Sequence, residues 1–179
     1  MDRWREIPSF PFYVVSDRGQ VRNQGTGHFL AILVNQGGVA YVSITRSGQQ
    51  YSRSVAKLVA EAFLPPPQHE SWDTPMNLNG NRADNRVENL MWRPRWFVAK
   101  YHRQMHQADW SVLIQVEETG QEMTIAEAAM KYGALPIDLF NAAMNYTYYN
   151  RSNALAWPTR FHFKMVESTH ITTRRNRRV

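Results

Sequence analysis

Short runs of apolar residues, separated by turn sequences, dominate residues 1–50. Apolar and aromatic residues recur in 10–15, 29–34 and 39–44, and the sequences SDRG, NQGG and SGQQ separate or close these runs. β-Branched and aromatic residues in runs of this length, bounded by Gly, Asn and Ser, are typical of strands. The pattern therefore predicts a small β-rich module at the start of the chain.

After this module the spacing of the apolar residues changes from that of strands to that of a helix. In residues 54–64 apolar side chains recur every three or four positions, which predicts a helix that the prolines from Pro65 onward end. Residues 76–92 contain an Asn-Gly turn followed by apolar positions, as in a hairpin. The sequence RPRWFVAKYHRQMH then indicates a basic, aromatic helix after Pro94.

The last third of the chain contains the apolar patterns of both strands and helices. Residues 110–116 indicate a strand, Thr124 is placed to cap a helix that Gly133 ends, and a second helix is expected over 136–145. A final strand is expected within 160–166. The predicted fold class is α+β, with a small β-rich module, a central hairpin-helix unit, and a C-terminal β-hairpin plus helix-turn-helix.

We expect four segments. A β module spans 1–50, the hairpin-helix unit spans 51–109, a strand and helix-turn-helix module spans 110–167, and a basic tail spans 168–179. The prediction follows from the change of hydrophobic period near residue 50 and from the arginines that crowd the end of the chain.

The amino-acid composition excludes several classes of protein. The net charge is +6, and 43% apolar and 12% aromatic residues suffice for a packed core. The chain has no cysteine, which excludes disulfides, thiolate zinc sites and a cysteine nucleophile. No run approaches the roughly 18 apolar residues that cross a bilayer, and MDRWREIPSF lacks the apolar stretch of a secretory signal. We therefore expect a cytoplasmic protein with no membrane partner.

Two stretches together resemble the phage-type homing endonucleases of the HNH (His-Asn-His) superfamily. The sequence WREIPSFPFYVVSDRGQV is similar to a motif that these nucleases often carry, through Trp4, Ile7, Phe10, Tyr13, Val15, Ser16, Asp17, Gly19 and Val21. SVAKLVAEAFLPPP followed by MNLNGNRADNRVENLMW resembles the family's helix and ββα-metal hairpin. The resemblance extends over nearly the whole chain and implies a DNA-binding nuclease scaffold.

The residues that would perform the chemistry depart from the family pattern. The resemblance implies a general-base histidine where Asn77 stands, and metal ligands where Met76 and Val98 stand. Asn79 replaces a usual Asp, while Asn89 keeps the asparagine that holds the loop. An amide accepts no proton near neutral pH, and Met and Val are poor ligands for a hard cation. We therefore expect a degenerate centre at Asn77, Asn89 and His102, with no cofactor and no efficient cleavage.

Two histidines leave an enzymatic alternative open. His102 and His106 lie four residues apart on the predicted helix, so both imidazoles share one face. They are candidate metal ligands for a rearranged nickase that would use Mg²⁺, Mn²⁺, Zn²⁺ or Ni²⁺. In the other interpretation the two side chains face solvent or DNA phosphates.

Double-stranded DNA is the expected partner. Cations interleaved with aromatic residues can neutralise phosphates, and amides can bond to base edges. The candidate DNA-binding residues are Arg18, Arg22, Asn79, Asn81, Arg82, Arg93, Arg95, Lys100, Arg103, Asn141, Asn145, Arg174, Arg175, Arg177 and Arg178.

The helix-turn-helix of residues 124–145 has two interpretations. Asn141 and Asn145 are suited to reading adenine, but the second helix carries Asp138 and no Lys or Arg. The module therefore binds either DNA or a host or phage protein, and a factor that targets a host protein is a further alternative for the whole chain. The resemblance implies a phage-encoded protein that acts in a bacterial host cell.

Overall fold

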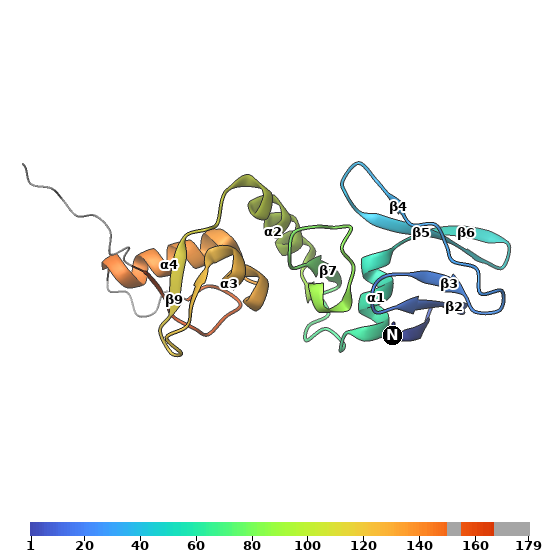
Figure 1. Ribbon diagram of the computed structural model, residues 1–179, viewed down its shortest axis with the longest axis horizontal. Helices are drawn as coiled ribbons and strands as arrows, with labels where there is room; N and C mark the ends of the chain where they lie inside the picture. Colours follow the sequence, from blue (N-terminus) through green and yellow to red (C-terminus); the bar gives the residue numbers. More distant parts are fainter. Residues whose placement is uncertain (150–154, 167–179) are drawn as a thin grey trace, which may run out of the picture.

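The computed structural model describes residues 1–149 and 155–166. The molecule is elongated, with two small N-terminal sheets at one end, a hairpin and a long helix in the middle, and the C-terminal module at the other end (Figure 1). None of the helices in these residues has the length and continuous apolar surface needed to cross a bilayer. The α+β class predicted from the two hydrophobic periods is confirmed.

The N-terminal end consists of two three-stranded antiparallel sheets, β1-β2-β3 and β4-β5-β6. Their strands are β1 (Trp4–Ile7), β2 (Phe10–Ser16), β3 (Val21–Asn23), β4 (Leu33–Val34), β5 (Ala40–Arg46) and β6 (Gln49–Ser54). Ala40, Val42 and Ile44 of β5 are buried, so the alternate residues of this strand lie on the opposite face of the sheet. One face of the second sheet is thereby left for solvent or a ligand.

The strand expected over 29–34 is shorter than its sequence suggests. Only the two residues of β4 pair with β5, and Phe29, Ile32, Leu33 and Val34 are between 44% and 57% exposed. An apolar run becomes a full strand only when both neighbours and a covering layer are present. In the described residues nothing covers this edge.

The first core forms where helix α1 (Val55–Phe63) packs against both N-terminal sheets. The helix begins and ends within one residue of the predicted segment. Its apolar face, with Val55, Leu58 and Val59, packs beside Ile7 and Ile44 of the sheets. Every one of these five side chains is at most 1% exposed, so the helix is fixed firmly against the β module.

The middle of the molecule is a two-stranded hairpin followed by a helix. It comprises β7 (Thr74–Asn77), a 3₁₀ turn η1 (Val87–Asn89), β8 (Leu90–Arg93) and α2 (Arg95–Gln107). Pro94 is the N-cap of α2, as its position just before the helical period predicted. The hairpin is shared between two cores, because Leu90 packs into the N-terminal core and Met76 into the C-terminal core.

The C-terminal module is an antiparallel sheet covered by two helices. Its elements are β9 (Leu113–Val116), β10 (Glu122–Thr124), α3 (Ile125–Tyr132), α4 (Pro136–Tyr149) and β11 (Phe163–Met165). The predicted cap at Thr124 is confirmed: its hydroxyl accepts from the N–H of Glu127 while its own N–H donates to the Glu127 carboxylate. Gly133 ends α3 at φ +58°, also as predicted, whereas α4 runs four residues beyond its expected end.

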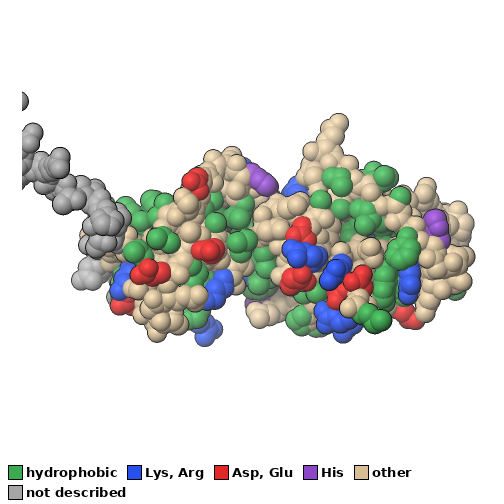
Figure 2. All heavy atoms as spheres, in the orientation of Figure 1, with side chains coloured by type: hydrophobic (Ala, Val, Ile, Leu, Met, Phe, Trp, Pro, Cys, Tyr) green, Lys and Arg blue, Asp and Glu red, His purple; other side chains and the backbone are tan. Residues whose placement is uncertain are grey.

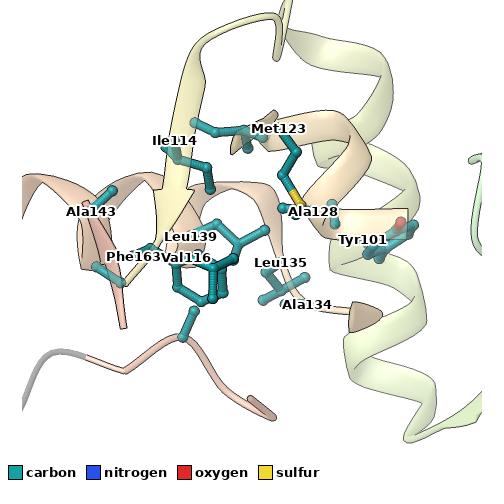
Figure 3. Close-up of a cluster of buried hydrophobic side chains, with 14 of the residues drawn as sticks. Tyr101, Ile114, Val116, Met123, Ala128, Ala134, Leu135, Leu139, Ala143 and Phe163 are labelled. Carbon is teal, nitrogen blue, oxygen red and sulfur yellow. The ribbon is translucent and has the colours of Figure 1, made fainter. Parts of the chain in front are cut away.

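Helix α2 belongs to this second core. Its residues Phe97 and Tyr101 are fully buried with Ile114, Leu139 and Phe163 of the C-terminal module. Figure 3 shows Tyr101 on α2 facing the cluster of side chains from the sheet and from α3 and α4. The hairpin-helix unit and the C-terminal module therefore fold around one continuous core.

Arg93 fastens the end of the hairpin to the end of α3. Its guanidinium donates to the carbonyls of Tyr132 and Gly133, each at 3.3 Å, and to that of Trp92 at 3.0 Å. The first two carbonyls lie at the C-terminal, negative end of the helix dipole. A Cβ atom on Gly133 would lie only 2.7 Å from Arg93 Nη2 and 2.6 Å from Met91 Sδ. Gly133 is thus required both for its φ angle and for this contact.

We predict that Gly133→Ala lowers the free energy of unfolding by more than the about 1 kcal/mol that a left-handed alanine costs. The excess is expected because the new methyl displaces both Met91 and Arg93. Gly120→Ala is the matched control, since Gly120 also has a positive φ (+68°) but a Cβ added there would meet no atom within 4 Å. Urea unfolding followed by tryptophan fluorescence measures both losses, and equal losses would show that the Arg93 contact is dispensable.

Candidate nuclease centre and nucleic-acid interface

The loop between β7 and β8 is held by side-chain amides. Asn89 Oδ1 accepts from the N–H of Asn79 at 2.9 Å, and Asn89 Nδ2 donates to Asn79 Oδ1 at 3.0 Å. The same Nδ2 also donates to the carbonyl of Asp84 at 2.7 Å, and Asn79 Nδ2 donates to the Asp84 carboxylate at 2.8 Å. Asn89 therefore holds the loop in the way that the resemblance implies for this asparagine.

Asn77 stands where the resemblance implies a general base. Its side chain is a second amide that holds the same loop. Its side chain is 3% exposed, and Nδ2 donates to the carbonyl of Asp84 at 2.8 Å and to Asn85 Oδ1 at 3.2 Å. An amide that donates in this way stabilises the loop, but it offers no basic nitrogen to a water molecule. The geometry agrees with a structural role for Asn77.

The two positions where the resemblance implies metal ligands carry apolar side chains in a core. Met76 is fully buried and Val98 is 6% exposed, and both belong to the C-terminal hydrophobic cluster. Neither supplies an oxygen or nitrogen atom to a cation. No group of three His, Asp or Glu residues that could hold a metal ion occurs within 1–149 and 155–166. The donor set therefore does not fit a hard divalent cation.

The two histidines of α2 converge on one carbonyl. His102 Nδ1 lies 3.2 Å and His106 Nε2 lies 3.1 Å from the carbonyl oxygen of Gly80. For His102 to donate to this oxygen, its proton must be on Nδ1, which leaves Nε2 as an acceptor. Burial, helped by the positive charge of Arg82, lowers the pKa of His102 to about 4. His102 is therefore neutral near pH 7, and the pair supports the turn at Gly80.

A cavity of about 290 Å³ lies between α1, β7 and α2, where the nuclease centre is expected. Asn77, Val98 and His102 line it together with two cationic residues, Lys57 and Arg82. The structure thus brings together the replaced general-base position, one replaced ligand position and His102. It places Met76 in the core, and His106 does not line the cavity.

The outward face of α2 carries three of the predicted DNA contacts. Arg95, Lys100 and Arg103 are exposed, and the small Ala99 lies exposed between Arg95 and Arg103. Arg93 is a correction to the prediction, because its side chain is buried at 6% exposure and donates to carbonyls at the end of α3. Burial also lowers its pKa. Arg93 is therefore not available at the surface to meet a phosphate.

The arginines of the N-terminal turn are partly engaged within the protein. Arg18 forms an ion pair with Asp2 at 3.3 Å, although its side chain is 70% exposed. The guanidinium of Arg22 lies over the ring of Trp4, 4.3 Å from the ring centroid. The exposed ion pair of Arg18 is weak and exchanges readily, and the ring contact leaves Arg22 its charge, so both cations stay candidates for contact with DNA.

Sequence reasoning missed the outward face of the β4-β5-β6 sheet. Three cross-strand pairs lie opposite the buried face of β5: Tyr41 with Ser54, Ser43 with Ser52, and Thr45 with Gln50. Hydroxyl and amide groups on this face can bond to base edges or phosphates. The missed signal was the alternation in AYVSITR, together with the absence of any Asp or Glu between residues 18 and 60.

The remaining predicted contacts lie in three places. At the hairpin tip, Asn79 and Asn81 are exposed and Arg82 is partly exposed. In the C-terminal module Asn141 is exposed, but the amide of Asn145 donates to the Asn141 carbonyl at 2.8 Å. The predicted tail contacts Arg174, Arg175, Arg177 and Arg178 lie outside the described residues.

One face of the molecule carries paired charges. Figure 2 shows Lys and Arg side chains next to Asp and Glu side chains over the middle of this face. Ion pairs that the structure contains include Arg86 with Asp84 at 2.9 Å, Arg3 with Asp17 at 2.8 Å, and Lys164 with Glu117 at 2.8 Å. The arginine partners hold the pKa values of Asp84 and Asp17 below their usual range. Neutralised pairs attract DNA less than the unpaired cations of α2 do.

Part of the chain is similar in sequence to known proteins. Residues 2–45 match the NUMOD4 motif. The uncharacterised HNH endonuclease L247 of Acanthamoeba polyphaga mimivirus is 34% identical over 92 residues, which cover 50% of this chain and 23% of that protein. L245 of the same virus, also an uncharacterised HNH endonuclease, is 27% identical over 90 residues, covering 50% of this chain and 26% of that protein.

The fold has a counterpart among solved structures. The HNH homing endonuclease I-HmuI, described in terms of its DNA binding and cleavage, matches with a TM-score of 0.52 and 15% identity over 93% of this chain and 99% of that chain. The matched regions span about a quarter of the length of each viral relative.

We predict that the buried, neutral state of His102 makes the protein less stable in mild acid. The pKa of His102 is about 4 when folded and 6.5 at its ordinary value, so the unfolded chain binds more protons between these limits. The free energy of unfolding should fall as pH decreases through this window, by up to about 1.4 kcal/mol per pH unit from this residue.

His102→Asn tests the cause, because Asn keeps an N–H donor for Gly80 but does not titrate. Urea unfolding of both proteins between about pH 5 and pH 7 should show a shallower pH dependence for the variant. Parallel profiles would contradict the assignment of this dependence to His102.

Proposed function

Because the chain is related by sequence and by fold to the HNH-type endonucleases, we propose that it binds double-stranded DNA without cleaving it efficiently. The observation that carries the proposal is the contrast between two sets of residues. Asn79 and Asn89 still hold the hairpin loop, whereas Asn77, Met76 and Val98 supply neither a general base nor metal ligands. The scaffold is intact while the chemistry is missing.

The proposed contact surface combines three elements. The outward hydroxyl and amide face of β4-β5-β6 offers bonds to base edges, and the exposed Arg95, Lys100 and Arg103 of α2 offer charge to phosphates. The hairpin tip, with Asn81 and Arg82, lies between them in the chain. Ala99, which is exposed on the same face as Arg95 and Arg103, allows the helix backbone to approach the DNA closely.

The C-terminal module contributes less charge to this surface. Among its described residues, Lys164 is paired with Glu117, and Asp138 lies near the start of α4 with its pKa raised by burial. Asn141 is the exposed amide on α4 that is best suited to reading a base. We propose that this module adds contacts to DNA that contribute less electrostatic attraction than those of α2.

A phage or other mobile element acting in a bacterial cytoplasm is the setting that we propose. The phage-type motifs of the sequence support it, and the relatives described above support a viral origin but not a bacterial host. This setting goes beyond what the two relatives establish, because their descriptions name them only as uncharacterised HNH endonucleases.

We predict that Lys100→Glu with Arg103→Glu weakens DNA binding by more than tenfold at about 100 mM salt and reduces the slope of log affinity against log salt by about 2. Each reversed charge removes a phosphate contact and adds repulsion. Fluorescence anisotropy with a labelled duplex measures both quantities.

The matched control is Lys131→Glu with Lys164→Glu, which reverses the same number of charges on the C-terminal module. It should change affinity much less, because it alters net charge without touching the proposed surface. Equal losses in the two double variants would mean that only overall charge attracts the DNA.

We also predict that the protein produces no nicked plasmid above a protein-free control with Mg²⁺, Mn²⁺, Zn²⁺ or Ni²⁺. The reason is the absence of a general base and of a hard-ligand set among the described residues of the centre. Incubation with supercoiled plasmid followed by gel electrophoresis tests this. Nicked product that disappears in His102→Ala would instead establish a rearranged nickase that uses His102.

A further inference from the structure

The cavity between α1, β7 and α2 has cationic groups on two of its walls. Arg82 reaches it from the hairpin loop and Lys57 from the first turn of α1. In the related nucleases a metal ion would supply the positive charge at this centre, but the donor set in the described residues does not fit one. The charge inside the cavity therefore comes from side chains.

Arg82 lines the cavity and is held by one hydrogen bond. Its Nη1 donates to the carbonyl of Gly37, in the turn between β4 and β5, at 3.3 Å. Arg82 and His102 line the same cavity, and after burial the positive charge of Arg82 also lowers the pKa of His102. Within the described residues its other guanidinium nitrogen atoms have no hydrogen-bond partner, so donors are left for a ligand.

Lys57 stands on the opposite wall. Its ammonium donates to the carbonyl of Asp73 at 2.7 Å, lies 3.6 Å from the Glu61 carboxylate and lies 4.7 Å from the centre of the Trp92 ring. These contacts hold the ammonium in place. A lysine has three N–H donors, so one stays available to a further acceptor.

The start of α1 adds to the same potential. Ser54 is the N-cap of this helix but makes no side-chain capping bond, and the first turn contains no acidic residue. Both Ser54 and Ala56 line the cavity, so the positive end of the helix dipole opens onto it. The buried His102 also lines the cavity, but it is neutral and its Nε2 is an acceptor, so the donors for an anion come from Arg82, Lys57 and the start of α1.

Two carboxylates oppose these groups: Glu61 pairs with Lys57 at 3.6 Å, and Asp73 is part of the lining. Asp73 lines the cavity, but it is exposed to solvent and accepts from the hydroxyl of Thr74 at 2.8 Å. Its charge is therefore screened more than that of the two cations. The lining of the cavity therefore suits an anionic ligand and not a metal cation.

We propose that this cavity binds a backbone phosphate of DNA directly, with Arg82 and Lys57 taking the place of a metal ion. This inference rests on the proposed function and names the ligand of its central site. The phosphate accepts hydrogen bonds from Arg82 and Lys57 and lies near the start of α1, and no divalent cation takes part. Loss of catalysis and retention of DNA affinity then have one common cause, the exchange of a metal for fixed side-chain cations.

We predict that wild-type protein binds a labelled duplex equally well with EDTA and with Mg²⁺ at matched ionic strength. Arg82→Gln and Lys57→Gln should each weaken binding several-fold and reduce the salt slope by about 1, because each removes a charge from one phosphate contact. Arg82→Lys should keep the slope. Lys131→Gln, which removes an exposed cation on α3 outside this cavity, is the control and should leave both quantities unchanged.

Thermal unfolding of each variant by circular dichroism confirms that it is folded. The inference would be overturned if the affinity for the duplex depended on Mg²⁺. It would also be overturned if Arg82→Gln kept the wild-type affinity and salt slope. In both cases DNA binding itself would still hold. If no duplex binds, the proposed function fails, and NMR with inorganic phosphate then decides on the site alone. Shifts of the Arg82 and Asn77 side-chain signals, relative to chloride at equal ionic strength, would support the cavity, and unchanged signals would overturn it.

Discussion

The arrangement of the centre depends on one carbonyl group, that of Asp84, which accepts from two buried amides. Asn77 donates to it at 2.8 Å and Asn89 at 2.7 Å, from the two sides of the loop. A buried carbonyl without a partner would be costly, and two partners fix the loop from both sides. With the loop fixed, the Gly80 carbonyl meets the imidazoles of α2 and Arg82 reaches the turn between β4 and β5.

The same constraint explains how a nuclease scaffold can lose its base and keep its shape. The resemblance implies a histidine at position 77, whereas the amide of Asn77 bonds to the loop that carries it. Met76 and Val98 likewise add apolar contacts to the core that α2 shares with the C-terminal module. At each of these three positions the side chain present packs or bonds internally, which is consistent with the loss of cleavage that we propose.

Local signals predicted most of the elements, and contacts between distant segments decided the rest. The cap at Thr124, the stop at Gly133 and the helix after Pro94 follow from neighbouring residues, and all were confirmed. The burial of Arg93 depends on a helix end 40 positions away, so a basic sequence alone placed it wrongly at the surface. The hydroxyl face of the second sheet was missed because serine and threonine carry no charge, and its exposure follows only from the register of β5 with β6.

The continuous core through α2 has a consequence for the DNA binding that we propose. Because Phe97 and Tyr101 are buried among residues of the C-terminal module and Arg93 holds the end of α3, the two ends of the molecule cannot rotate separately. Each base pair adds about 3.4 Å along a duplex, and about ten complete a turn. One inserted base pair between the segments of DNA met by the two ends would shift and rotate one segment against a rigid protein. A protein that binds DNA in the proposed way would therefore be sensitive to the spacing of the two segments that it contacts.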